Sequence, residues 1–313
     1  MRGILTYWPG MRNASTPRVA GVCYCLLDSV SACFYDSATF RFSIMRLSAR
    51  SDGAMLALAL LAWCAPGAGH ADQLKLVVQS QIHGHDTRAA FAPLVEYLSD
   101  ASGHRLVLQV PDSVLAHWQA MGRGEGYDLV LDEGHFTDYR VNRLDYQVLA
   151  KIAGTSGFSI VTGPATVFVE PDELHGEPVA SPPPPSLAAL RLVELFPDPI
   201  RAPILVEVDS YEEGIRRVIS GEVAAAVIPS HMLRKHPQLN VVLSTEQEPG
   251  MALSAAPSVS AETREVIRRA FLAAADIDAG RRALARAGLA GFEPAAAELY
   301  DGQARLLRGT WGY

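Results

Sequence analysis

"DSVLAHWQAMGRGEGYDLVLDEGHF", residues 112–136, aligns without a gap on "DSYEEGIRRVISGEVAAAVIPSHML", residues 209–233. Both copies begin with Asp-Ser and carry Gly-Glu 12 residues after that Asp. Apolar residues recur at the spacing of one helix face, at Val114, Trp118 and Met121 in the first copy and at Tyr211, Ile215 and Val218 in the second. An Asp or Ser favours the start of a helix and a Gly favours its end. Each copy therefore predicts one helix with a buried face.

Short apolar runs flank both predicted helices. Residues 106–110 and 204–208 precede them, and residues 128–131 and 223–228 follow them. Strands that are apolar almost throughout are typical of a parallel sheet covered on both faces. The repeated stretch therefore predicts two related α/β lobes, each containing a strand–helix–strand unit.

The rest of the chain extends this pattern. Residues 74–78 predict another strand, and a second strand–helix pair is expected at residues 177–196. Beyond residue 258 the pattern is helical. We expect a bilobal α/β protein with a cleft. Its predicted first lobe comprises residues 72–163 plus 248–313, and its predicted second lobe comprises residues 164–247.

The N-terminal region predicts export. Residues 45–71 carry Arg46 and Arg50, then an apolar core, and end in a small-residue site at Ala71, which is the layout of a secretory signal peptide. Lipidation at Cys64 is a minor alternative. We expect residues 1–44 to be an over-extended reading of the gene or a disordered leader; a cysteine metal site there is the weaker alternative. The expected product is a soluble periplasmic protein.

The charge and motifs exclude some function classes. Residues 129–136, "LVLDEGHF", resemble the ATP box of a helicase, but the 313 residues contain no G-x-x-x-x-G-K-[ST] phosphate loop. The formal net charge of −7 does not suit a nucleic-acid partner. No nucleophile elbow, Ser-His-Asp spacing or paired-carboxylate motif supports an enzyme. We therefore expect a binding protein without a cofactor or a bound metal.

The order of these pieces resembles the phosphonate/phosphate-binding (PhnD-like) proteins of ABC transporters. The matching stretches are residues 91–108, 171–181, 209–229 and 280–300. The resemblance implies a type II periplasmic-binding-protein fold, with two lobes that close at a hinge on a small anion. It also implies a monomer that delivers its ligand to an ABC permease. Two alternatives stay open: a receptor that signals to a membrane histidine kinase, and a small enzyme on the same fold.

The sequence departs from this family at "SPPPPSL", residues 181–187. Family members have a Ser/Thr-rich turn here, whose hydroxyls and amides hold the phosphoryl group. Four prolines remove four N–H donors from that turn. Ser181, Ser186 and the amides from Ser186 onward remain as candidate contacts, so this turn offers fewer donors to a phosphoryl group than the turn of the family.

Other candidate ligand contacts lie in loops at strand ends, where open α/β sheets place their ligands. The candidates are Ser80 and His83 in the first loop, Asp132 and His135 after the strand at 128–131, Ser210 and Tyr211 at the second repeated helix, and Ser230. Asp132 and its neighbour Glu133 suit a cationic or zwitterionic ligand better than an anion. Alternatively, both carboxylates complement the dipole of the following helix, and Ser210 is only a helix cap.

Overall fold

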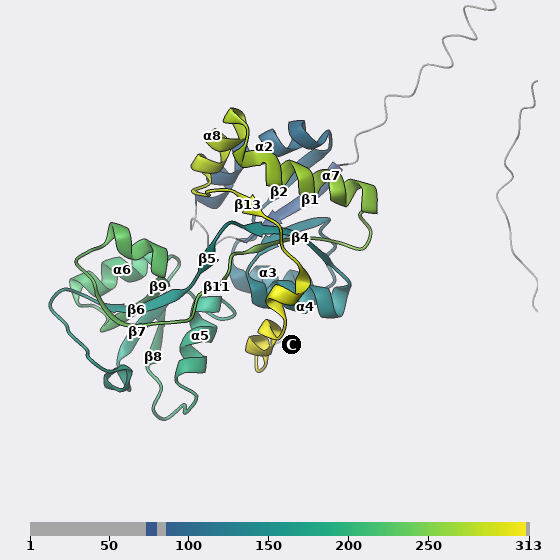
Figure 1. Cartoon of the computed structure of the whole chain (residues 1–313). Coiled ribbons are helices and arrows are strands. Elements are labelled where there is room, and N and C mark those ends of the chain that lie inside the picture. Colours follow the sequence, from purple (N-terminus) through teal and green to yellow (C-terminus); the bar gives the residue numbers. More distant parts are fainter. Residues whose placement is uncertain (1–72, 80–85, 311–313) are drawn as a thin grey trace, which may run out of the picture. The chain divides into compact units, whose positions relative to one another are not determined.

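Two mixed β-sheets organise the part of the chain that the structure, a computed structural model, describes, namely residues 73–79 and 86–310 (Figure 1). These residues belong to one compact unit. The predicted leader and signal peptide lie outside the described residues, and so do Ser80 and His83.

The first sheet has the strand order β13-β4-β12-β3-β1-β2. Strand β1 pairs in parallel with β2 and β3, while β12 is antiparallel to both of its neighbours, β3 and β4. The strands span Gln73–Val78 (β1), Arg105–Gln109 (β2), Leu129–Asp132 (β3), Gln147–Ile152 (β4), Ala252–Ala255 (β12) and Phe292–Glu293 (β13).

The second sheet has the order β10-β6-β9-β7-β8. Here β7 pairs in parallel with β8 and β9, and β6 is antiparallel to β9 and β10. The strands span Phe158–Thr162 (β6), Pro178–Ser181 (β7), Ile204–Glu207 (β8), Ala225–Pro229 (β9) and Asn240–Ser244 (β10). Both sheets thus place the two strands of the repeated unit on either side of an earlier strand and insert an antiparallel strand beside them.

The repeated stretch folds as predicted. Helix α3 (Val114–Gly122) connects β2 to β3, and α6 (Tyr211–Ser220) connects β8 to β9. The Ser113 hydroxyl accepts a hydrogen bond from the Ala116 amide, and Ser210 caps α6 in the same way. Gly221 ends α6 at a φ of 75°, a conformation that glycine adopts without strain.

Two short strands mark where the chain crosses between the sheets. Thr155–Ser156 (β5) pairs with Glu248–Pro249 (β11) in a two-stranded antiparallel sheet (Figure 1). The chain enters the second sheet directly after β5, at β6, although the predicted first lobe runs to residue 163. Strand β6 is buried along its whole length, and such burial is compatible with a position in either sheet. Only the strands with which β6 pairs show that it belongs to the second sheet.

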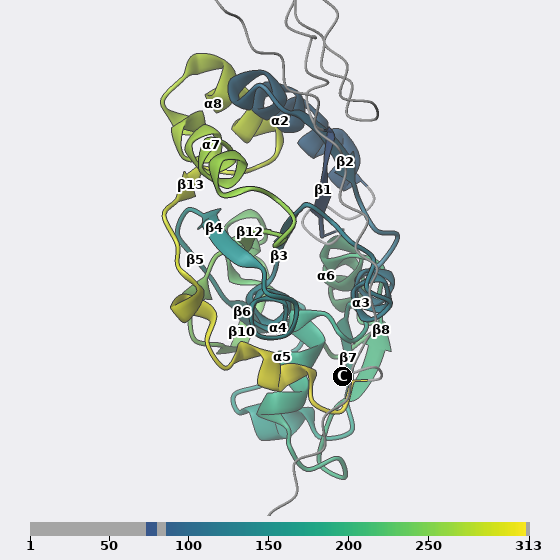
Figure 2. The same ribbon diagram turned by 90° about the vertical axis from the view of Figure 1, so that its right-hand side faces the viewer.

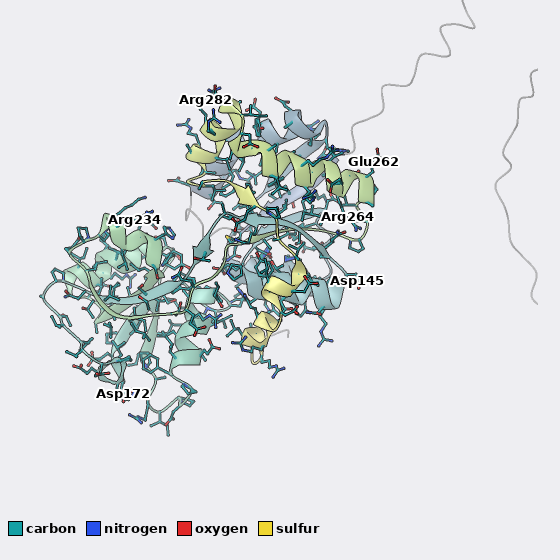
Figure 3. The ribbon with its side chains drawn as sticks, viewed as in Figure 1. Asp145, Asp172, Arg234, Glu262, Arg264 and Arg282 are labelled. Carbon is teal, nitrogen blue, oxygen red and sulfur yellow. The ribbon has the colours of Figure 1, made fainter. Side chains whose placement is uncertain are left out.

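The helices cover the sheets with their apolar faces. Figure 2 shows α2, α7 and α8 side by side, and their residues Phe91, Phe271 and Leu284 belong to the core of the first sheet. Figure 3 shows charged side chains of both signs, such as Glu262 and Arg282, on the outside of this layer. The helices span Thr87–Ser102 (α2), Gly134–Leu144 (α4), Leu187–Leu195 (α5), Ala261–Leu272 (α7) and Asp278–Arg286 (α8).

Short 3-10 helices complete the fold, and two of them near the C-terminus pack on α4. They span Pro171–Leu174 (η4), Ser230–Lys235 (η5), Ala273–Ala275 (η6), Ala297–Tyr300 (η7) and Gln303–Leu307 (η8).

Trp118, which the helix spacing predicts to be a core residue, is buried against Phe136 and Leu307. Within the described residues, no helix has the length and apolarity needed to cross a bilayer.

Candidate functional site

A small pocket lies where the junction of β3 and α4 meets the start of α5 and the crossing strands. Glu133 lines it at the junction of β3 and α4, and Leu187 lines it at the start of α5. The other lining residues include Ser156 and Glu248 of the crossing strands, Phe158 of β6 and Gln303 of η8. Its volume is about 30 Å³, which is room for one or two water molecules. The pocket is therefore too small to hold a solute in this structure.

Two hydrogen bonds join the turn after β3 to the Pro-rich turn before α5. The Nε2–H of His135 donates to the carbonyl oxygen of Pro185 at 3.0 Å, and the amide of Leu187 donates to Oε2 of Glu133 at 3.4 Å. The two turns lie about 50 residues apart in sequence. The structure thus brings together two of the loops in which the sequence predicts ligand contacts.

Among the described residues, Glu133 is the pocket carboxylate without a cationic partner. Nε2 of Gln79 donates to its Oε2 at 2.8 Å, and its own amide donates to Oε1 of Gln79 at 3.1 Å. Burial raises the pKa of Glu133 to about 7 against the opposing effect of these hydrogen bonds, and the charge of Asp132 adds to the rise. Among the described residues, no lysine or arginine forms an ion pair with Glu133 or lowers its pKa.

The other pocket carboxylate is neutralised. Arg191 of α5 donates hydrogen bonds to Glu248 of β11 and to Glu194 of its own helix. Glu194 also pairs with Arg305 of η8, at 3.0 Å. These ion pairs attach α5 both to a crossing strand and to the C-terminal segment. In the described part of the chain, Glu133 is then the pocket carboxylate that no cation neutralises.

Asp132 lies inside the protein, in a network of polar side chains. Arg140 of α4 forms an ion pair with its carboxylate, Oγ1 of Thr137 donates to it at 3.1 Å, and Nε2 of His117 lies 3.0 Å from it. Burial alone would raise the pKa of Asp132, but Arg140 and these hydrogen bonds hold it below its usual value. The carboxylate therefore anchors α3 and α4 to the end of β3. No periodicity in the sequence indicates this network.

His135 is fully buried beside the pocket. Since its Nε2 faces a carbonyl oxygen, that nitrogen carries the hydrogen, and Nδ1 has no hydrogen-bond partner among the described residues. Burial lowers the pKa of His135 to about 3, so the ring is neutral near pH 7. In this structure it holds the Pro-rich turn, and its predicted contact with a ligand stays a prediction.

The two candidate serines of the Pro-rich turn bond within that turn. The hydroxyl of Ser186 donates to the carbonyl of Pro182 at 2.8 Å and accepts from the amide of Ala189 at 3.2 Å, which caps α5. The hydroxyl of Ser181 donates to the same carbonyl of Pro182 at 3.1 Å. Both serines are fully buried, so neither hydroxyl hydrogen is free for a ligand in this conformation.

The remaining candidates lie near the pocket or behind it. Tyr211 is buried, with its ring centroid 6.3 Å from that of Phe158, and both burial and the charge of Glu133 raise its pKa. The hydroxyl of Ser230 bonds to that of Ser159 at 2.8 Å. Ser210 caps α6, in agreement with the alternative given for it. The described residues include no cluster of three or more His, Cys, Asp or Glu side chains that would suit a metal ion.

Residues 76–300 match the family described as "ABC transporter, phosphonate, periplasmic substrate-binding protein". Among solved structures, PhnD1 from Prochlorococcus marinus in complex with methylphosphonate is similar at a TM-score of 0.64 and 13% identity, over 77% of this chain and 99% of that chain. A binding protein component of an ABC phosphonate transporter from Pseudomonas aeruginosa is similar at a TM-score of 0.60 and 15% identity, over 75% and 84% of the two chains.

A protein from Xanthomonas citri, solved with bound ATP, is similar at a TM-score of 0.63 and 15% identity, over 76% of this chain and 99% of that chain. No curated protein matches the sequence. These likenesses confirm the two-lobe α/β fold of periplasmic binding proteins that the resemblance implied.

Proposed function

Because the chain belongs to the family of periplasmic phosphonate substrate-binding proteins of ABC transporters, we propose that it captures a small polar solute between its two lobes and delivers it to an ABC permease. The family consists of binding proteins rather than enzymes. The observation that carries the proposal is the pair of hydrogen bonds between the turn after β3 and the turn before α5, of which the bond from the Leu187 amide to Glu133 joins two residues that line the pocket.

Binding is coupled to hinge closure at the two crossing strands. Strands β5 and β11 pair side by side, and a Cβ atom at Gly250 would lie only 2.5 Å from the carbonyl oxygen of Ile152. A glycine therefore permits the close approach of the two crossing segments. Rotation at this point separates Glu133 and His135 from α5 and admits the solute, and closure restores the contacts around it.

The predicted signal peptide, residues 45–71, supports export to the periplasm, and we propose that the mature protein acts there as a monomer. The ligand contacts predicted at Ser80, His83, His135 and Tyr211 are part of the proposal. His135 follows the pocket residue Gly134 in the chain, and the Tyr211 ring lies 6.3 Å from that of the pocket residue Phe158, whereas Ser80 and His83 lie outside the described residues.

A screen of melting temperature tests the proposal. Phosphonates, phosphate, phosphite, amines and amino acids are each added to the mature protein. A ligand at 100 times its Kd stabilises the folded state by about 2.7 kcal/mol, which raises Tm by about 5–10 °C for a protein of this size. Small-angle scattering with the solute that stabilises the protein should give a smaller radius of gyration than without it. An unchanged radius at saturation would contradict hinge closure.

A further inference from the structure

The start of α5 is already occupied by the chain's own groups. An anion binds at the N-terminus of a helix because the first N–H groups have no partner within the helix. Here Ser186 N donates to Pro183 O at 3.0 Å, Leu187 N to Glu133 Oε2, and Ala189 N to the Ser186 hydroxyl. The four residues before Ser186, residues 182–185, are prolines and have no backbone N–H group. Within the described stretch 182–189, these bonds leave the amide of Ala188 as the remaining backbone donor for an anionic ligand.

The charge at this position also opposes an anion. The Glu133 carboxylate lies against the amide of Leu187, where an incoming anion would have to bind, and no described arginine or lysine offsets it. Glu248 does not compete for a cation in the same way, because Arg191 pairs with it. Removal from water destabilises a charged carboxylate, and a positively charged partner offsets that cost.

Apart from Glu248, the other residues that line the pocket are uncharged. Ser156 and Gln303 offer uncharged polar groups, while Phe158, Pro249 and Met251 offer apolar surface. The lining thus combines the Glu133 carboxylate with uncharged polar groups and an apolar portion, which fits an ammonium group attached to a short hydrocarbon portion.

We propose that Glu133 sets the specificity of the cleft, so that this chain binds a small solute bearing a protonated amino group and rejects simple phosphonates. The inference rests on the proposed function, in which the same cleft receives the solute. In it, the ammonium donates to the Glu133 carboxylate, and Gln79 holds that carboxylate in place with its 2.8 Å hydrogen bond.

Three probes of equal chain length test the assignment: n-propylammonium, propylphosphonate and 1-propanol. Each is titrated at pH 8 into the unmodified mature protein, into Glu133→Gln and into Glu298→Gln, which changes an exposed glutamate. Binding is measured by calorimetry and by the shift in Tm. The comparison of the probes on the unmodified protein does not depend on any variant folding correctly.

The unmodified protein and Glu298→Gln should bind n-propylammonium more tightly than the other two probes. Glu133→Gln should weaken that binding at least about 10-fold, because a hydrogen bond to a charged group is lost, and it should strengthen the binding of propylphosphonate. Tighter binding of propylphosphonate than of n-propylammonium to the unmodified protein, or an unchanged ammonium affinity in Glu133→Gln, would overturn the inference and leave the proposed function intact.

Absence of n-propylammonium binding would also overturn the inference. The screen of melting temperature then decides whether the proposed function fails as well. If a solute without an ammonium group stabilises the protein, the proposed function stands and only the specificity assigned to Glu133 fails. If no solute of any class stabilises it, the proposed function fails as well.

Discussion

Replacement of Glu133 by Gln should change how the stability of the ligand-free protein depends on pH. Burial raises the pKa of Glu133 from 4.5 to about 7 in the folded protein. The folded state therefore binds the proton more tightly than the unfolded state, and stability is lost as pH rises from about 4.5 to about 7. The neighbouring titratable groups, Asp132 and Tyr211, remain in place in the variant.

The size of the effect follows from the same pKa. Each pH unit between the folded and unfolded pKa corresponds to about 1.36 kcal/mol, which gives an upper limit of about 3 kcal/mol. Because water partly reaches the side chain of Glu133, we expect about 2 kcal/mol. Glu133→Gln keeps a similar shape and can still accept the Leu187 amide. It should therefore be more stable than the unmodified protein by about 2 kcal/mol at pH 8 and by under about 1 kcal/mol at pH 5.

Urea unfolding at pH 5, 6, 7 and 8, without added solute, measures this difference. Glu298→Gln serves as the matched control, because it removes an exposed carboxylate and should follow the unmodified protein at every pH. An equal stability of Glu133→Gln and the unmodified protein at pH 8 would refute the reasoning, and so would a difference that does not grow between pH 5 and pH 8.

Two further substitutions test the structural roles of candidate residues. Asp132→Asn leaves the buried charge of Arg140 without its carboxylate and should destabilise the protein by about 3–5 kcal/mol in guanidinium unfolding; a loss under about 1 kcal/mol would contradict the buried ion pair. Ser186→Ala removes the cap of α5 and should cost about 1–2 kcal/mol, whereas Ser220→Ala, at an exposed site, should stay within about 0.5 kcal/mol. Equal melting temperatures for these two serine variants would argue against the capping role.

The contents of the site were only partly predictable. The turn after β3 and the Pro-rich turn were expected to face a cleft, and a hydrogen bond between His135 and Pro185 does bring these two turns together. The loop residues Ser80 and His83 lie outside the described residues. Nothing in the sequence indicated that Glu248 pairs with Arg191, because 57 residues separate them and neither belongs to a motif.

The sequence alone determined the local structure of both lobes. The repeated spacing of apolar residues sets one buried face on α3 and one on α6, and the residues that cap and end these helices lie within a few positions of them. The sequence alone predicts helix faces and caps because the residues that form them lie close together in the chain. They were sufficient to predict two α/β units.

Only the tertiary structure decided where the remaining groups lie. Strand β6 is buried along its whole length, including its polar residues Ser159 and Thr162, so its burial would suit either sheet. Its pairing with β9 and β10 places it in the second sheet. Glu133 acquires its special environment from Gln79 and Leu187, each 54 residues away along the chain. Sequence periodicity reports which face of an element is buried, but the partner that covers that face depends on how distant elements pack.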